Sequence, residues 1–262
     1  MENPALFLTA FYVKLLIFYA YYEIANIIER MNVMEMRQNQ SAVIESIDIK
    51  KDFTYNSVVM LSADLSAPQI TLKNNRRVQN TINRYNRIFL MKYYRYAANT
   101  LYKNAIENYR ESVKNGFPFH EFAAVLKYNV TLNDNCHLSL YSDFYEYTGG
   151  AHGMTYRTPQ SWNLNNGKLL KMSDLFPRGE NYRKNVLDRI LAIADEQMAQ
   201  DGIYFEDYRK LIVENFNEDN FYLDANNLIV YYGLYEIAPY AAGIIEFKIP
   251  YSFVNAKKPS CD

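Results

Sequence analysis

One long stretch of helical periodicity, residues 75–114, constrains the fold of this chain most strongly. Its apolar and aromatic side chains recur at intervals close to three and four residues, the spacing of a single helical face; they are Val78, Ile82, Tyr85, Phe89, Tyr93, Tyr96, Leu101 and Tyr109. Gly116 and Pro118 come next and predict the end of this helix. A helix with one apolar face must bury that face against another element, so the flanking sequence has to supply an apolar surface.

Alternating apolar and polar side chains on both sides of the helix predict strands that supply this surface. Residues 53–65 alternate, and Pro68 is expected to end that strand. After the helix, residues 122–132 alternate, a turn is expected at residues 133–135, and an apolar face continues from Cys136 to Phe144. His137 falls on the polar side of this returning strand and is expected to be solvated.

The last hundred residues predict a second group of helices and strands. Asn165-Asn166-Gly167 is typical of a tight hairpin turn, because Asn and Gly tolerate positive φ. Ser173 or Asp174 is expected to cap the segment after this hairpin, with helices over 180–200 and 204–215 and strands over 228–235 and 244–253. This order predicts an α+β fold, in which antiparallel strands and hairpins pack against one long and one or two shorter helices.

The pattern also suggests three parts of the chain. Residues 1–40 are an apolar, signal-like or anchoring segment with a polar tether, residues 41–118 an N-terminal strand and long-helix subdomain, and residues 119–262 a C-terminal domain. The apolar run, residues 4–28, is interrupted only by Lys14 and Glu23, and about twenty apolar residues suffice to span a bilayer. It lacks a basic n-region and a clear small-residue cleavage site. We therefore expect a membrane anchor or uncleaved signal; a buried amphipathic helix and a start displaced by a gene-boundary error remain alternatives.

Charge is segregated along the chain, although the net charge is only −1. A basic stretch carries Lys73, Arg76, Arg77, Arg84, Arg87, Lys92, Arg95, Lys103 and Arg110 against the single acid Glu107. An acidic stretch carries Asp195, Glu196, Asp201, Glu206, Asp207, Glu214, Glu218, Asp219 and Asp224 against Arg209 and Lys210. Either both stretches are solvated faces, or one of them receives an oppositely charged partner.

The sequence offers no constellation typical of catalysis or metal binding. His120, His137 and His152 stand far apart and match no zinc-ligand spacing, and no nucleophile elbow or phosphate-binding glycine loop occurs. Cys136 and Cys261 form no metal pattern; they are able to pair, but the sequence does not show whether they do. We predict no catalytic residue, metal or cofactor. A nucleic-acid partner is not expected either, because the tyrosines of the basic helix stand mostly at core spacing.

The segment from Gly149 to Gly153 is the most unusual feature of the sequence. It holds three of the nine glycines and one of the three histidines of the chain. Glycines permit positive φ and close approach of the backbone, so the segment either makes a compact turn or opens backbone N–H groups toward a ligand. Because His152 has no evident catalytic partner in the sequence, a structural or recognition role is favoured for it.

Four stretches resemble a domain family of formally unknown function in bacteria. Three of them are YTGGAHGMTY, LNNGKLLKMSDLF and YEIAPYAAGIIEFKIPYS; upstream, DLSAPQITLKNNRRVQNTIN resembles the companion domain that usually precedes the family. The family forms the extracytoplasmic part of the lysozyme-sensing anti-sigma-V factor and also occurs beside the catalytic domain of a peptidoglycan deacetylase. The resemblance covers roughly residues 52–253.

This resemblance implies an extracytoplasmic α+β domain without catalysis of its own, which in one branch binds lysozyme through loops. The matching positions are Tyr147, Gly149, Gly150, Ala151, His152, Gly153, Pro239 and Tyr240. Only Met1 to Asn3 precede the apolar run, which argues against a sigma-factor-binding segment, and the deacetylase catalytic domain is absent from the sequence.

The leading hypothesis is therefore a membrane-tethered binding or sensing module outside the cytoplasm, whose ligand is lysozyme or a cell-wall component. The alternatives are an accessory of a cell-wall glycan hydrolase or transferase that uses His152 with an unidentified carboxylate, and a purely structural domain.

Overall fold

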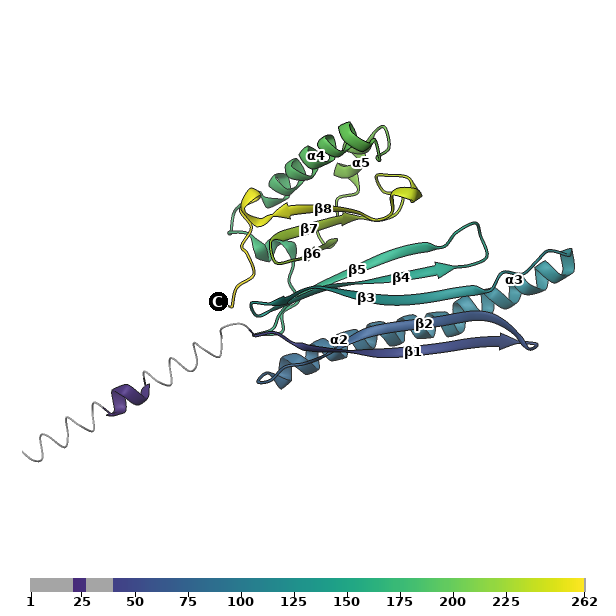
Figure 1. Ribbon diagram of the computed structural model, residues 1–262, viewed down its shortest axis with the longest axis horizontal. Helices are drawn as coiled ribbons and strands as arrows, with labels where there is room; N and C mark the ends of the chain where they lie inside the picture. The colour runs from purple at the N-terminus through teal and green to yellow at the C-terminus, as the bar shows by residue number, and fades with distance from the viewer. Residues whose placement is uncertain (1–20, 27–39, 262) are drawn as a thin grey trace, which may run out of the picture.

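The computed structural model describes residues 21–26 and 40–261 (Figure 1). The apolar run expected to anchor the chain lies mostly outside the described residues, and only its short helical segment at 21–26 belongs to them. Among the helices of the described residues, none combines the length and the apolar character needed to cross a bilayer.

A five-stranded sheet forms the first half of the fold. Its strands are β1 (Val43–Tyr55), β2 (Val58–Thr71), β3 (Phe122–Asp134), β4 (His137–Tyr147) and β5 (Met154–Asn163), in that spatial order. Neighbouring strands are antiparallel except β2 and β3, which pair in parallel over Leu61–Leu65 and Phe122–Leu126. A parallel pair needs a long crossover, and the predicted long helix supplies it.

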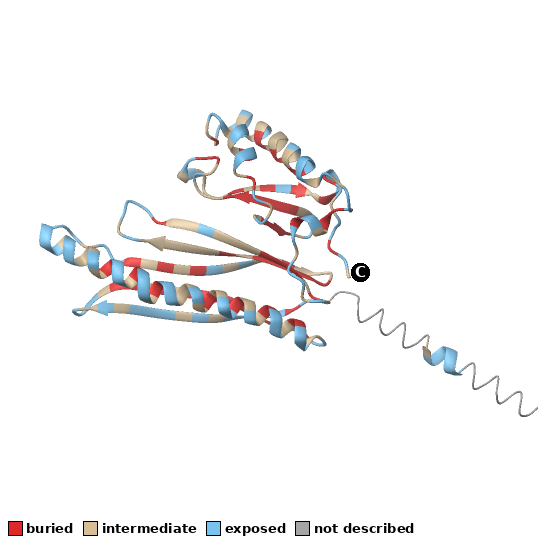
Figure 2. Cartoon of the chain, turned by 180° about the vertical axis from the view of Figure 1, so that it is seen from behind, coloured by how far each residue is buried: buried red, intermediate tan, exposed pale blue. Residues whose placement is uncertain are grey.

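That helix begins and ends where the sequence predicts. It consists of α2 (Arg76–Tyr96), a π-helical turn (Ala97–Leu101) and α3 (Tyr102–Asn115), which succeed one another without a break. The side chain of Asn75 accepts a hydrogen bond from the N–H of Val78 at the start, and Gly116 ends the helix with a φ of 71°. Figure 2 shows the helix lying along the sheet with exposed residues on its outer side.

A three-stranded sheet and two helices form the second half. The sheet contains β6 (Phe221–Leu223), β7 (Asn227–Tyr232) and β8 (Ile245–Pro250), all antiparallel, with β7 in the centre. One face packs in a core with α4 (Tyr182–Asp201) and α5 (Tyr208–Glu214). The other face packs on the five-stranded sheet, where Tyr222, Ile229 and Tyr231 meet Tyr141. The result is a layered α+β fold of helix, sheet, sheet and helices, as expected from the sequence (Figure 1).

The predicted strand over residues 53–65 is wrong in its extent. Asn56 and Ser57, with φ of 50° and 64°, make a turn that divides the region between β1 and β2. Pro68 does not end β2, which continues to Thr71. Beyond Leu65 only β1 pairs with β2, and side chains of α2 bind the backbone on the other edge: the amide of Asn83 contacts both the N–H and the carbonyl of Ile70, at 2.7 and 2.8 Å. A proline is compatible with a strand whose second edge carries no ladder.

The expectation that His137 is solvated is also wrong. Its side chain is buried, and its Nδ1 lies 2.7 Å from the carbonyl oxygen of Asn135. The face of β4 that carries His137 also carries Ser139, whose hydroxyl accepts a hydrogen bond from the N–H of Leu223 in β6. Both faces of β4 are therefore covered, one on the side of the long helix and the other by the second sheet.

Two further connections bear on the predicted parts of the chain. Cys136 and Cys261, whose pairing the sequence left open, form a disulfide with their Cα atoms 5.0 Å apart. It closes a loop of 125 residues and ties the β3–β4 turn to the C-terminal segment, which on a chain-entropy argument is worth about 2–5 kcal/mol. The boundary expected between residues 118 and 119 falls between α3 and β3, inside the segment that builds the five-stranded sheet.

Candidate functional site

The glycine-rich segment forms the bend between β4 and β5. Gly149 has a φ of 89°, which disfavours any residue with a Cβ. Gly153 is required for a different reason, because a Cβ there would lie 2.4 Å from the ring of Tyr145 and 2.5 Å from the carbonyl oxygen of Glu146. Gly150 meets neither constraint, since its nearest neighbour would be 3.8 Å away. Two of the three glycines thus fix the path of the bend.

This bend places His152 against the loop that precedes β8. The imidazole stacks on the ring of Tyr240, with the centroids 3.8 Å apart and an interplanar angle of 21°. The Tyr240 hydroxyl donates to the carbonyl oxygen of Gly153 at 3.0 Å. The structure therefore brings together two loops that the sequence separates by 87 residues.

The remaining contacts of His152 occupy both ring nitrogens. Nδ1 lies 3.0 Å from the carbonyl oxygen of Gly153, which fits a protonated Nδ1, and Nε2 lies 3.3 Å from the hydroxyl of Tyr235. The histidine is exposed, and within the described part of the chain no carboxylate bonds to it. The described residues also contain no group of three or more His, Cys, Asp and Glu side chains placed to hold a metal ion.

The predicted site residues do not all join this contact. Pro239 is exposed and caps the 3₁₀ turn Tyr240–Ala242, whereas Gly150 and Ala151 are exposed on the bend. Tyr147 ends β4, where it pairs with Ala123. Tyr235 was not predicted as a site residue, although it opens the YEIAPY stretch; its side chain is exposed and its ring lies 5.7 Å from that of Tyr240. We call His152, Gly153, Tyr235, Pro239 and Tyr240 the loop junction.

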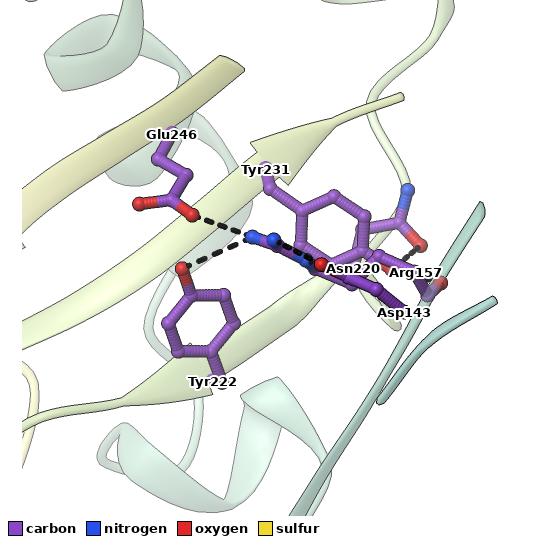
Figure 3. Close-up of polar contacts among 6 residues, drawn as sticks. All are labelled: Asp143, Arg157, Asn220, Tyr222, Tyr231 and Glu246. Carbon is purple, nitrogen blue, oxygen red and sulfur yellow. Dashed lines mark hydrogen bonds and ion pairs between the residues drawn. The ribbon is translucent and has the colours of Figure 1, made fainter. Parts of the chain in front are cut away.

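A buried ionic cluster lies between the two sheets, on the strands that carry these loops (Figure 3). Arg157 of β5, with 7% of its side chain exposed, forms two parallel hydrogen bonds to Asp143 of β4, at 2.7 and 2.8 Å. Its Nη1 also donates to Glu246 of β8 at 2.5 Å, and its guanidinium carbon lies 3.5 Å from the ring centroid of Tyr141. The hydroxyl of Tyr231 in β7 donates to the carbonyl oxygen of Arg157 at 2.9 Å.

The electrostatics of this cluster favour its charged form. Burial opposes the charge of Arg157, but the hydrogen bonds and charges of Asp143, together with Glu246, outweigh burial and raise its pKa. Burial likewise raises the pKa of Tyr222 and of Tyr231, so both phenols stay protonated at neutral pH. Arg157 lies four residues after Gly153 and Glu246 six after Tyr240, so this cluster holds the two loops of the junction at a fixed separation. No feature of the sequence distinguished Arg157 from the other arginines.

The predicted acidic stretch is neutralised in part within its own half of the molecule. Asp195 pairs with Arg209, the carboxylate of Glu218 lies 3.2 Å from Arg183, and that of Glu214 lies 3.6 Å from Lys210. The hydrogen bonds from Arg209 and Tyr208 lower the pKa of Asp195. Part of the acidic surface is therefore a set of local ion pairs.

Comparison with known proteins places both halves of the chain. Residues 54–155 match the family model described as Deacetylase PdaC, and residues 173–252 match the model described as Protein of unknown function (DUF3298). A search of curated proteins finds no match.

Two solved structures share the fold. A member of the DUF3298 family from Bacteroides fragilis has a TM-score of 0.61 at 22% identity and covers 84% of this chain and 95% of its own. A DUF3298 family protein from Pseudomonas aeruginosa has a TM-score of 0.59 at 19% identity, with 84% and 96% covered. The chain therefore joins a PdaC-like segment to a DUF3298-like segment, which confirms its resemblance to a bacterial domain family of unknown function.

Proposed function

We propose that this protein is a non-enzymatic binding or sensing module outside the cytoplasm, and that the loop junction contacts its ligand. The ligand we propose is lysozyme or another cell-wall-associated molecule. The observation that carries the proposal is the exposed stack of His152 on Tyr240, held by a bend whose glycines the backbone requires. A stiff aromatic surface on a fixed loop loses little conformational entropy on binding, which is why tyrosines are frequent in recognition loops.

The contacts of His152 favour recognition over bond breaking. A general base needs a free nitrogen within reach of the substrate proton, and in many hydrolases a carboxylate orients the ring. Here one nitrogen faces a backbone carbonyl and the other a tyrosine hydroxyl. The second candidate, an accessory role in cell-wall glycan hydrolysis or transfer, draws support from the deacetylase name of the PdaC family, whose match at residues 54–155 includes His152.

Two features support the proposed compartment and partner. The Cys136–Cys261 disulfide fits an oxidising environment, because disulfides persist outside the cytoplasm and are rare within it. The stretch from Asp195 to Asp224 holds nine acids against Arg209 and Lys210, so it attracts a cationic protein such as lysozyme even though some of its acids are paired.

Calorimetry with a C-type lysozyme at low salt tests the proposal. We expect the unaltered protein to bind and Tyr240→Ala to weaken binding about tenfold or more, as expected for a central aromatic contact. Phe253→Ala is the matched control, because Phe253 is also an exposed aromatic but lies on the 3₁₀ turn after β8, and this variant should bind normally.

The outcomes separate the parts of the proposal. If the unaltered protein does not bind, lysozyme is removed as the ligand, and a pull-down with purified peptidoglycan tests the cell-wall arm. If Tyr240→Ala and His152→Ala both bind like the parent, the loop junction is not the contact surface. A parent protein that turns over muropeptides, with turnover lost in His152→Ala, would favour the accessory-enzyme alternative instead.

A further inference from the structure

A groove runs along one flank of α2, where the helix leaves part of the five-stranded sheet uncovered. The floor is formed by Ile47 of β1 and Gln69 of β2, and the groove encloses about 850 Å³. The α2 residues that line it are Asn80, Asn83, Arg84, Arg87, Ile88, Met91 and Arg95. The groove exists because α2 packs on β2, so the apolar residues of β1 that face the helix, Ile47 among them, stay half-buried.

Three arginines of this groove carry unneutralised charge. Arg84, Arg87 and Arg95 are all exposed, and among the described residues no side chain forms an ion pair or hydrogen bond with their guanidinium groups. Arg157, Arg183 and Arg209 of the same chain all have carboxylate partners. The positive potential along α2 is therefore available to a ligand.

We propose that this groove binds an acidic peptide segment of a partner protein in an extended conformation. The planar guanidinium fork matches a carboxylate through two parallel hydrogen bonds. Ile47, Ile88 and Met91 supply apolar contacts for the side chains between the acids, and 56% of the Ile88 side chain is exposed without a partner to cover it. The amides of Gln69 and Asn80 are placed to bind the peptide backbone.

The lining favours a peptide over other polyanions. Sugars and the bases of single-stranded nucleic acids need aromatic rings to stack on, and none of the described residues that line the groove is aromatic. A phospholipid surface would engage a convex face, whereas these arginines border a groove with an apolar floor.

The spacing of the arginines defines the peptide. Arg84 and Arg95 are eleven residues apart, which corresponds to roughly 16 Å along the helix axis, at 1.5 Å per residue. An extended chain covers that distance in about five residues, at 3.3 Å each. The best ligand thus has acids near both ends of a segment of about five residues, with apolar side chains between them.

Fluorescence anisotropy with a labelled peptide that has glutamates at both ends and leucines between them tests this inference on the full chain. We expect Arg84→Gln/Arg87→Gln/Arg95→Gln to weaken binding at least tenfold at low salt. The control Arg76→Gln/Arg77→Gln/Lys92→Gln removes the same charge from exposed positions of α2 outside the groove, and it should weaken binding less than twofold.

Equal losses in the two triple variants would overturn the site, because they would show only the effect of net charge. Tighter binding of polyphosphate or of phosphatidylglycerol vesicles than of the peptide would overturn the ligand class. A groove variant that dissociates a dimer of the parent protein would show that a second copy occupies the groove and would also overturn the proposal. The inference is independent of the loop junction, since Tyr240→Ala should leave peptide binding unchanged.

Discussion

The glycines of the β4–β5 bend show how single residues shape the candidate site. Gly149 supplies a positive φ, and Gly153 lets the backbone lie against the ring of Tyr145. This close approach presents the Gly153 carbonyl to both Tyr240 and His152. The bend therefore determines where the imidazole stacks.

At this scale we predict that Gly153→Ala destabilises the protein by about 1–3 kcal/mol, because the added methyl overlaps Tyr145 and Glu146 in a packed turn. Urea unfolding followed by the fluorescence of Trp162 measures the change. Gly150→Ala is the matched control and should stay within about 0.5 kcal/mol of the parent. Similar effects of the two substitutions would show that Gly153 is not held by its close contact.

Among the elements, short turns depend on side chains that bind the backbone. The 3₁₀ turn Met172–Leu175 begins where the carboxylate of Asp174 accepts a hydrogen bond from the N–H of Lys171 at 2.9 Å and pairs with Lys168 at 2.7 Å. Burial opposes the ionised form of Asp174, but the hydrogen bonds from Lys168 and Lys171 outweigh burial and lower its pKa. The sequence predicted a capping role for Ser173 or Asp174, and Asp174 fills it in this turn; α4 begins later, at Tyr182.

We predict that Asp174→Ala costs about 1 kcal/mol at pH 7, a typical value for a lost cap. A lowered folded-state pKa contributes stability that is complete above the unfolded value, about 3.9, and is lost as the pH falls through the folded value. The difference between parent and variant should therefore shrink below about pH 4. Urea unfolding at several pH values measures it. Asp174→Asn keeps an acceptor and should lose less; a difference independent of pH would contradict the role of the charge.

For the whole molecule, the contact between the two sheets positions the loop junction. Arg157 links β4 and β5 of one sheet to β8 of the other through Asp143 and Glu246 (Figure 3). Thr131 reinforces the contact by donating from its hydroxyl to the carbonyl oxygen of Leu223 at 2.7 Å. The junction is formed by loops from both sheets, so its geometry depends on this interface.

We predict that Arg157→Leu destabilises the protein by about 3–5 kcal/mol, because it leaves two largely buried carboxylates without a partner. Adding Asp143→Asn and Glu246→Gln should recover part of the loss. Arg157→Lys, which keeps the charge without the fork, gives a milder variant if the leucine form does not fold. Chemical unfolding measures all three, with Arg76→Leu, at an exposed position of α2, as the control. No loss in Arg157→Leu would show that the cluster does not hold the sheets together.

The sequence by itself determined the elements whose signals are local: the long helix with its ends at Asn75 and Gly116, the β3–β4 hairpin, the helix that ends at Gly202, and two loops rich in glycine and tyrosine. It did not reveal β5 or the three-residue β6, because a buried or very short strand shows little alternation. Only the tertiary structure decided that His152 stacks on Tyr240, that His137 is buried, that Arg157 joins two sheets and that Cys136 meets Cys261. Each of these contacts joins distant parts of the chain, or depends on a second sheet covering the outer face of the first, and periodicity within one segment carries no information about what will cover it.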